Sequence, residues 1–178
     1  TIGAVTDNGN GTYTATVTNT VAESVTISGT LDGANITDTA TITFKDLTAP
    51  ILLSSTPSDN SSNIELDQNI ILNFSEDVVA GSGNIELYED NGLLVESFIV
   101  SSSIISGSTV TLNPVADLKY NFAYYIQIPA TSIKDAAGNT YAGITNNTAL
   151  NFITRLKTPK EGFAEVRDEV STTMKSNT

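Results

Sequence analysis

The feature that most constrains this chain is an alternation of apolar and polar residues in short runs, separated by Gly, Asn, Asp and Pro. A period of two places every second side chain on the same face, as expected for a β-strand with one buried side. Helical signals are nearly absent before residue 155. The sequence therefore predicts an all-β protein.

Residues 51–154 contain enough of these runs for a complete sandwich. The expected strands lie at 51–55, 64–66, 70–74, 85–87, 94–100, 110–112, 122–128 and 150–152. Eight short strands in about a hundred residues favour two packed sheets. Glu89-Asp90-Asn91-Gly92 separates two of them, and its Asn-Gly pair predicts a tight type I′ hairpin with positive φ at both residues.

Residues 1–46 contain fewer runs. Three are clear, marked by Tyr13/Ala15/Val17, Val25/Ile27/Leu31 and Ala40/Ile42/Phe44, and a short fourth strand is expected at 2–5. An immunoglobulin-like sandwich needs about seven strands. We therefore expect 1–46 to be the closing half of a domain whose earlier strands belong to a longer protein or come from a neighbouring subunit. Residues 47–50 form the expected linker, in which Pro50 fixes the backbone.

Residues 155–178 differ from the rest in period and charge. Phe163, Val166, Val170 and Met174 recur at spacings of three and four, and Thr158-Pro159 begins a helix-capping pattern that ends at Glu161. Residues 1–154 carry three basic and sixteen acidic side chains, whereas the tail carries five and four. We predict an amphipathic helix from about Pro159 to Lys175, which would be marginal without a surface to pack on.

Composition excludes several functions. The chain has no cysteine and no histidine, so it cannot form a disulfide, a Cys/His zinc site or a Ser-His-Asp triad. Its net charge of −12 would repel a nucleic acid. No apolar run is long enough to span a membrane, and the first residues lack the basic region of a signal peptide, so we expect a piece of a longer protein.

Several motifs in order carry a resemblance to a known family. They are Ala49-Pro50, the run 55–60 (STPSDN), the run 69–76 (NIILNFSE), Gly83-Asn84-Ile85, the run 134–139 (KDAAGN) and the closing Leu150-Asn151-Phe152. Residues 49–154 resemble the bacterial Ig-like domain of the S-layer-protein type. Residues 5–44 resemble the last strands of an invasin/intimin-type Ig-like domain. The resemblance implies tandem immunoglobulin-like β-sandwiches, the first incomplete, followed by the short α-helix.

One alternative alignment concerns the first segment. The run 7–13 (DNGNGTY) also resembles the tyrosine corner that precedes strand F of an antibody-type domain. Only one strand should follow strand F, but two follow Tyr13, so the strand count favours the invasin-type alignment.

Carboxylate and amide oxygens in loops are the hard ligands available here, and calcium is the cation that prefers them. The metal ligands we predict are Asp46, Glu76, Asp135 and Asn139, a set that would stiffen the junction between the domains. None of the loops has the spacing of an EF-hand. The alternative is that Asp and Asn occupy turns because they hydrogen-bond their own backbone, and Asp135-Ala136-Ala137-Gly138-Asn139 favours such a turn.

No catalytic residues are predicted. Glu86 and Glu89 could act as the acid and base of a glycosidase only in a cleft, and their positions beside a strand and a hairpin do not indicate one. The aromatic residues Tyr120, Phe122 and Tyr124 should share one strand face and enter the core, whereas Tyr125 points the other way.

The function expected from the resemblance is a non-catalytic spacer or stalk in a bacterial adhesin, at the cell surface or outside the cell. Expected partners are neighbouring Ig-like domains or subunits of the same protein, and a host or matrix surface. Two alternatives remain open: a polymerising subunit of a filament or layer, and an accessory region of a secreted polysaccharide-active enzyme. Calcium is the one cofactor expected.

Overall fold

The computed structural model describes residues 1–158, and these residues form β-strands and no helix. The predicted all-β class is therefore confirmed. The helix predicted from Pro159 to Lys175, and with it nearly all of the tail 155–178, lies outside the described residues. The chain divides into two compact units, Thr1–Thr48 and a second unit that begins at Ala49.

The N-terminal unit consists of three two-stranded antiparallel sheets. β1 pairs with β2, β3 with β6 and β4 with β5. The strands are β1 (Thr6–Asp7), β2 (Tyr13–Thr14), β3 (Ser24–Ile27), β4 (Thr30–Leu31), β5 (Ala34–Asn35) and β6 (Ala40–Thr43). The run marked by Tyr13, Ala15 and Val17 forms a strand only at Tyr13–Thr14. Beyond it, Val17 makes a single β-bridge to Ile2. No residue in this unit is buried.

The second unit is a sandwich of a five-stranded and a four-stranded sheet, with a short strand pair at one end. Its first strands are β7 (Leu52–Thr56), β8 (Ser61–Ile64), β9 (Ile70–Phe74), β10 (Val79–Ala80), β11 (Asn84–Glu89) and β12 (Leu94–Ile99). The remaining strands are β13 (Ile105–Ser106), β14 (Thr109–Leu112), β15 (Ala123–Gln127), β16 (Ile133–Lys134) and β17 (Asn151–Thr154).

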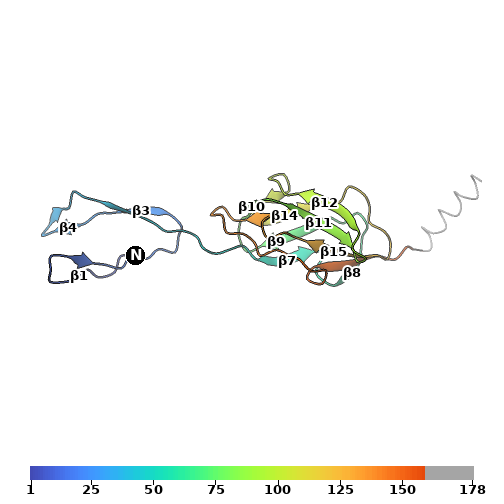
Figure 1. Cartoon of the computed structure of the whole chain (residues 1–178), viewed down its shortest axis with the longest axis horizontal. Coiled ribbons are helices and arrows are strands. Elements are labelled where there is room, and N and C mark those ends of the chain that lie inside the picture. Colours follow the sequence, from blue (N-terminus) through green and yellow to red (C-terminus); the bar gives the residue numbers. More distant parts are fainter. Residues whose placement is uncertain (159–178) are drawn as a thin grey trace, which may run out of the picture. The chain divides into compact units, whose positions relative to one another are not determined.

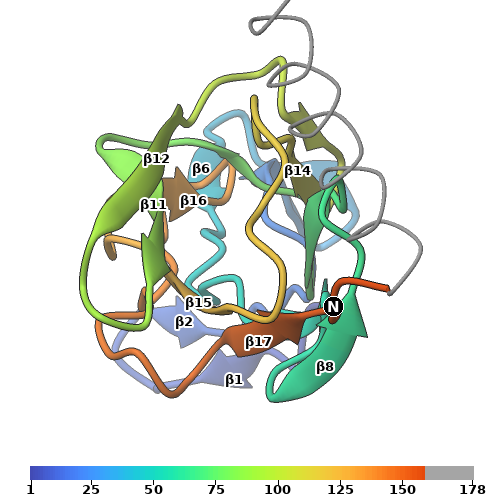
Figure 2. The ribbon, with the colours of Figure 1, turned by 90° about the vertical axis from the view of Figure 1, so that its right-hand side faces the viewer.

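The two sheets enclose one apolar core. The larger sheet has the order β12-β11-β15-β17-β8, and the smaller has the order β13-β14-β9-β7 (Figure 1). Figure 2 shows the larger sheet curving from β12 to β8 around the interior, with β14 on the opposite side. Alternation along each strand fills the interior: in β9, Ile70, Leu72 and Phe74 are buried and the residues between them are half-buried.

The chain enters and leaves the sandwich at opposite ends. β17 runs antiparallel to β15 and parallel to β8, with Phe152 opposite Ser61. The chain enters ahead of β7 at one end of the sandwich and leaves beyond β17 at the other (Figure 1). Arg155 is held at the exit by a 2.8 Å hydrogen bond from its backbone N–H to the carbonyl of Ile64.

The β11–β12 hairpin lies where Asn91-Gly92 predicts it, but the turn type is different. Only Gly92 has positive φ, at +87°, so the type I′ assignment is wrong. The Gly92 N–H donates to the carbonyl of Glu89, and the Glu89 N–H donates to the carbonyl of Leu93. Asn91 instead accepts the Leu93 N–H with its side-chain oxygen at 2.9 Å. This Asx-type bond satisfies the loop without positive φ at Asn91.

Candidate functional site

The turn at 135–139 is a closed hydrogen-bonded loop. The backbone N–H of Asn139 donates to Oδ1 of Asp135 and its side-chain amide donates to Oδ2, both at 2.7 Å. The Asp135 N–H donates to the carbonyl of Asn139, and Gly138 takes a positive φ of +97°. The structure therefore confirms the predicted turn, which holds a buried carboxylate, 3% exposed, at a fixed position.

Two opposing effects act on the pKa of the Asp135 carboxyl. Burial favours the neutral form and would raise the pKa. Hydrogen bonds from the Asn139 side chain and from the N–H groups of Asn139, Gly138 and Ala137 favour the charged form. The hydrogen bonds outweigh burial and lower the pKa of Asp135 below its ordinary value, so the site holds a carboxylate anion at neutral pH.

Glu76 lies next to this turn. The short β10–β16 pair sets Val79 opposite Lys134 and so draws the residues after β9 toward Asp135. Carboxylate oxygens of Glu76 and Asp135 lie within 4.8 Å of each other. A cation with ligand distances of about 2.3–2.6 Å could contact both. The sandwich thus brings together three of the four predicted ligands, Glu76, Asp135 and Asn139.

The fourth predicted ligand, Asp46, belongs to the N-terminal unit. Its side-chain oxygen accepts the backbone N–H of Thr48 at 2.9 Å, which is an Asx turn two residues before the end of the unit. Its participation in a metal site remains a prediction from the sequence.

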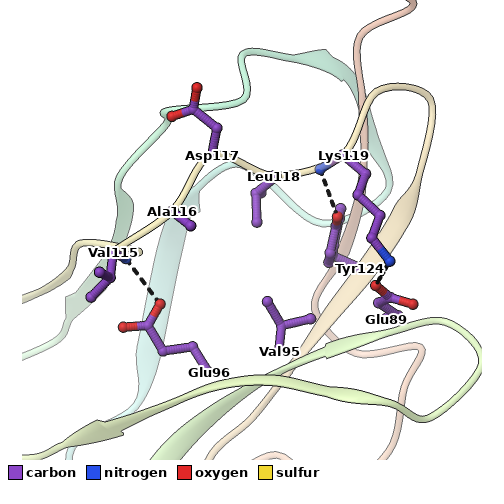
Figure 3. A pocket seen from close by; sticks show the side chains of 9 residues that line it. All are labelled: Glu89, Val95, Glu96, Val115, Ala116, Asp117, Leu118, Lys119 and Tyr124. Carbon is purple, nitrogen blue, oxygen red and sulfur yellow. Dashed lines mark hydrogen bonds and ion pairs between the residues drawn. The ribbon is translucent and has the colours of Figure 1, made fainter.

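A pocket of about 380 Å³ lies between β12 and the segment that precedes β15 (Figure 3). Val95 and Glu96 of β12 point into it from one side, and Leu118 and Tyr124 line the other. The remaining lining residues are Glu89, Val115, Ala116, Asp117 and Lys119.

An ion pair closes one end of this pocket. Lys119 Nζ contacts Glu89 Oε1, with the Glu89 side chain 5% and the Lys119 side chain 60% exposed. Hydrogen bonding to Lys119 lowers the pKa of Glu89, and the same bond raises the pKa of Lys119. The Lys119 N–H donates to the Tyr124 hydroxyl at 2.9 Å, and burial raises the pKa of that phenol. Sequence reasoning missed this pair because its partners are thirty residues apart.

The two carboxylates considered as a glycosidase pair do not face each other. β11 alternates, so Glu89 lies on the buried side and Glu86 on the outer face. Glu86 accepts a 2.5 Å hydrogen bond from the Tyr88 hydroxyl. That hydrogen bond, together with burial, raises the pKa of Tyr88.

Tyr124 and Tyr125 occupy the opposite faces that alternation predicts, and Phe122 packs against the core. The prediction for Tyr120 is wrong: it precedes β15, lies outside the core and has the Arg155 guanidinium 5.0 Å from its ring centroid. Tyr124 is buried against Phe152, with ring centroids 5.8 Å apart. Tyr125 lies on the outer face, where its ring stacks on Tyr88 at 5.1 Å and 9°. Because Tyr125 is only 8% exposed, it offers no open ring face to a sugar.

Comparisons with known proteins match two adjacent parts of the chain, within residues 1–154, to family models. The family model described as "Bacterial Ig-like domain" matches residues 46–154, and the model described as "Invasin, domain 3" matches residues 1–47. No curated protein matches the chain. Among solved structures, CopC from Methylosinus trichosporium OB3b matches at 14% identity and a TM-score of 0.47, over 61% of this chain and 96% of that one. No helix within residues 1–158 is long and apolar enough to cross a membrane.

Proposed function

Because the chain belongs to the bacterial Ig-like domain family, we propose that it is a non-catalytic structural and adhesive segment of a large bacterial surface or secreted protein. The observation that carries this proposal is the pair of adjacent family matches, an invasin domain over 1–47 and a bacterial Ig-like domain over 46–154. Within that family we assign the sandwich to the S-layer-protein type, on the motifs in the runs 69–76 and 134–139.

The specific role we propose is that of a spacer. The chain enters the sandwich at one end and leaves it at the other, so whatever precedes and follows it is held apart by the length of the sandwich (Figure 1). The core that gives it stiffness is a single apolar cluster, with Leu72, Ile85 and Ile126 fully buried. In this role the domain functions through the stiffness of its packed interior and not through a reactive residue.

The spacer role is tested by light scattering coupled to size-exclusion chromatography on residues 1–178. A monomer over the whole accessible concentration range is the expected result. Defined oligomers of fixed stoichiometry would instead favour the alternative role, that of a polymerising subunit in a surface filament or layer.

Calcium at the entry end of the sandwich is a second part of the proposal. Two carboxylates within 4.8 Å repel each other, and a divalent cation bound to both would remove that repulsion. Glu76 and Asp135 supply these carboxylates and Asn139 an amide oxygen. Asp46 is the fourth ligand that the sequence predicts.

Thermal unfolding in calcium and in a chelator tests this site. The melting temperature should rise with calcium concentration, because a ligand that binds only the folded state stabilises it. Glu76→Gln should abolish the rise while leaving the Asp135 turn intact. Asp67→Asn, a change at an exposed carboxylate, is the matched control and should keep the rise. A melting temperature that calcium does not change would refute the site.

A further inference from the structure

β12 is an edge strand that exposes several apolar side chains. In the described part of the chain it pairs with β11 alone. Leu94 is 46%, Val95 41% and Ile99 73% exposed. Edge strands can pair with another chain, and soluble proteins usually protect them with charges or proline. The β12 edge is therefore suited to adding a strand from outside.

A bulge aims two neighbouring side chains of β12 into the adjacent pocket. The register pairs Leu87 with Glu96 and Tyr88 with Leu94, which leaves Val95 as the extra residue. In a regular strand Val95 and Glu96 would point to opposite faces, but both line the pocket (Figure 3). Bulges that redirect side chains in this way are common beside binding sites.

The pocket combines apolar walls with uncompensated negative charge. Val95, Ala116 and Leu118 form the walls. Lys119 neutralises Glu89, whereas Glu96 accepts only the Val115 N–H at 3.0 Å among the contacts of Figure 3. Asp117 also lines the pocket, but its carboxylate points away from the interior, so Glu96 is the negative charge that faces inward (Figure 3). Within residues 1–158, neither Glu96 nor Asp117 forms an ion pair with a lysine or arginine.

This combination matches the chemistry of a lysine side chain. An alkyl stem covers apolar surface while its ammonium group pairs with a carboxylate. The contact of Lys119 with Glu89 shows that an ammonium group is already accommodated at one end of the pocket. The free strand edge specifies a polypeptide, because main-chain pairing with β12 requires an extended backbone.

We propose that the β12 edge and its pocket bind an extended, lysine-bearing segment of a partner protein. The backbone of that segment adds to β12, and its lysine enters the pocket and pairs with Glu96. This site goes beyond the spacer role and does not depend on it, since a spacer needs no ligand on the side of its sandwich.

Nuclear magnetic resonance titration of the full chain tests the site. The probe is the peptide acetyl-Thr-Val-Lys-Val-Thr-amide, and its matched control carries norleucine in place of lysine. Saturable shift changes are expected at the amides of Leu94, Glu96 and Val115. The affinity of the norleucine peptide should be lower by about fivefold or more, because its side chain lacks the positive charge of lysine. Equal binding of both peptides, changes elsewhere, or no saturation would overturn the proposal.

Variants of the chain separate the pocket from general electrostatic attraction. Glu96→Gln keeps an acceptor for the Val115 N–H and should lower affinity for the lysine peptide to that of the norleucine peptide. Val95→Lys places the chain's own ammonium group in the pocket and should block binding. Asp67→Asn removes one negative charge outside the pocket and should leave affinity unchanged. If Asp67→Asn weakened binding as much as Glu96→Gln, the pocket would not be the site.

Discussion

The N-terminal unit and the sandwich are built from the same kind of strand, but they bury it to very different extents. In β3, Val25 and Ile27 alternate with polar residues and stay half-buried, and Val25 lies opposite Ile42 of β6 in a sheet of only two strands. In β9, Leu72 alternates with half-buried neighbours and is 0% exposed, and Ile126 of β15 enters the same core and is also 0% exposed. The difference teaches that alternation specifies a strand, whereas burial requires a second sheet to cover it.

The largest effect that this comparison predicts is the loss of stability when a core side chain is truncated. Ile126→Ala in β15 should lower the free energy of unfolding of the sandwich by about 2–5 kcal/mol, because it removes buried methyl groups and leaves a cavity. Ile36→Ala in the N-terminal unit removes the same atoms from a side chain that is 49% exposed, and should cost less than about 1 kcal/mol.

Denaturant unfolding followed by tyrosine fluorescence measures both changes, because five tyrosines in the sandwich report on Ile126→Ala and Tyr13 in the N-terminal unit reports on Ile36→Ala. Equal losses for the two isoleucine variants would mean that the N-terminal unit has a packed interior of its own. The comparison between the units would then fail.

The same contrast explains which parts of the fold could be predicted from the sequence. Strands with clear alternation, such as 70–74 and 109–112, lie within a residue or two of their predicted positions. The two-residue strands β10, β13 and β16 were missed because a pair of residues has no period. The Asn91-Gly92 hairpin was located correctly, but its turn type depends on which hydrogen bonds Asn91 makes, and composition does not specify these.

The candidate sites likewise divide into one that could be predicted from the sequence and others that could not. The Asp135–Asn139 turn was predictable because its donors and acceptor lie within four residues of one another. The Glu89–Lys119 pair and the approach of Glu76 to Asp135 depend on strands that meet only in the folded sheet. The pocket beside β12 depends in addition on a bulge at Val95, for which the sequence gives no signal.

Removal of a buried hydroxyl group should cause the next largest loss of stability. Thr154 is 2% exposed, and its Oγ1 donates to the carbonyl of Lys119 at 2.5 Å and accepts the N–H of Phe122 at 3.0 Å. Thr154→Val keeps the shape but deprives both groups of a partner, so it should cost about 1–3 kcal/mol. Thr41→Val, at an exposed position of β6, should change stability by less than about 0.5 kcal/mol. Chemical denaturation of both variants measures these losses in the free energy of unfolding. Similar losses would contradict the contrast in burial between the two units.

The pH dependence of stability should also differ between the two units. The folded-state pKa of Asp135 is lowered, so its stabilising contribution is complete above the unfolded pKa of about 3.9 and is lost as pH falls through the lower folded value. Glu89 acts in the same direction through Lys119. Asp135→Asn should therefore flatten the fall in melting temperature below about pH 4.

Asp7→Asn in the N-terminal unit is the matched control for Asp135→Asn. The Asp7 side chain also closes a turn, accepting the Gly9 N–H at 2.8 Å, but it is exposed to solvent. The control should keep the wild-type fall in melting temperature. An unchanged fall in Asp135→Asn would show that the buried turn does not contribute.

The smallest effect is expected from the surface ion pair at the exit of the sandwich. It tests whether packing or surface charge stabilises the sandwich. Arg155 Nε lies 2.6 Å from Glu65 Oε2, but the Glu65 side chain is 60% exposed. Such pairs contribute about 0.2–1 kcal/mol, and salt screens them. A double-mutant cycle of Glu65→Gln and Arg155→Gln should give a coupling energy in that range, falling as salt is added. A coupling as large as the loss in Ile126→Ala would mean that charge at the exit holds the sandwich together as strongly as its core, and burial alone would no longer explain the difference between the units.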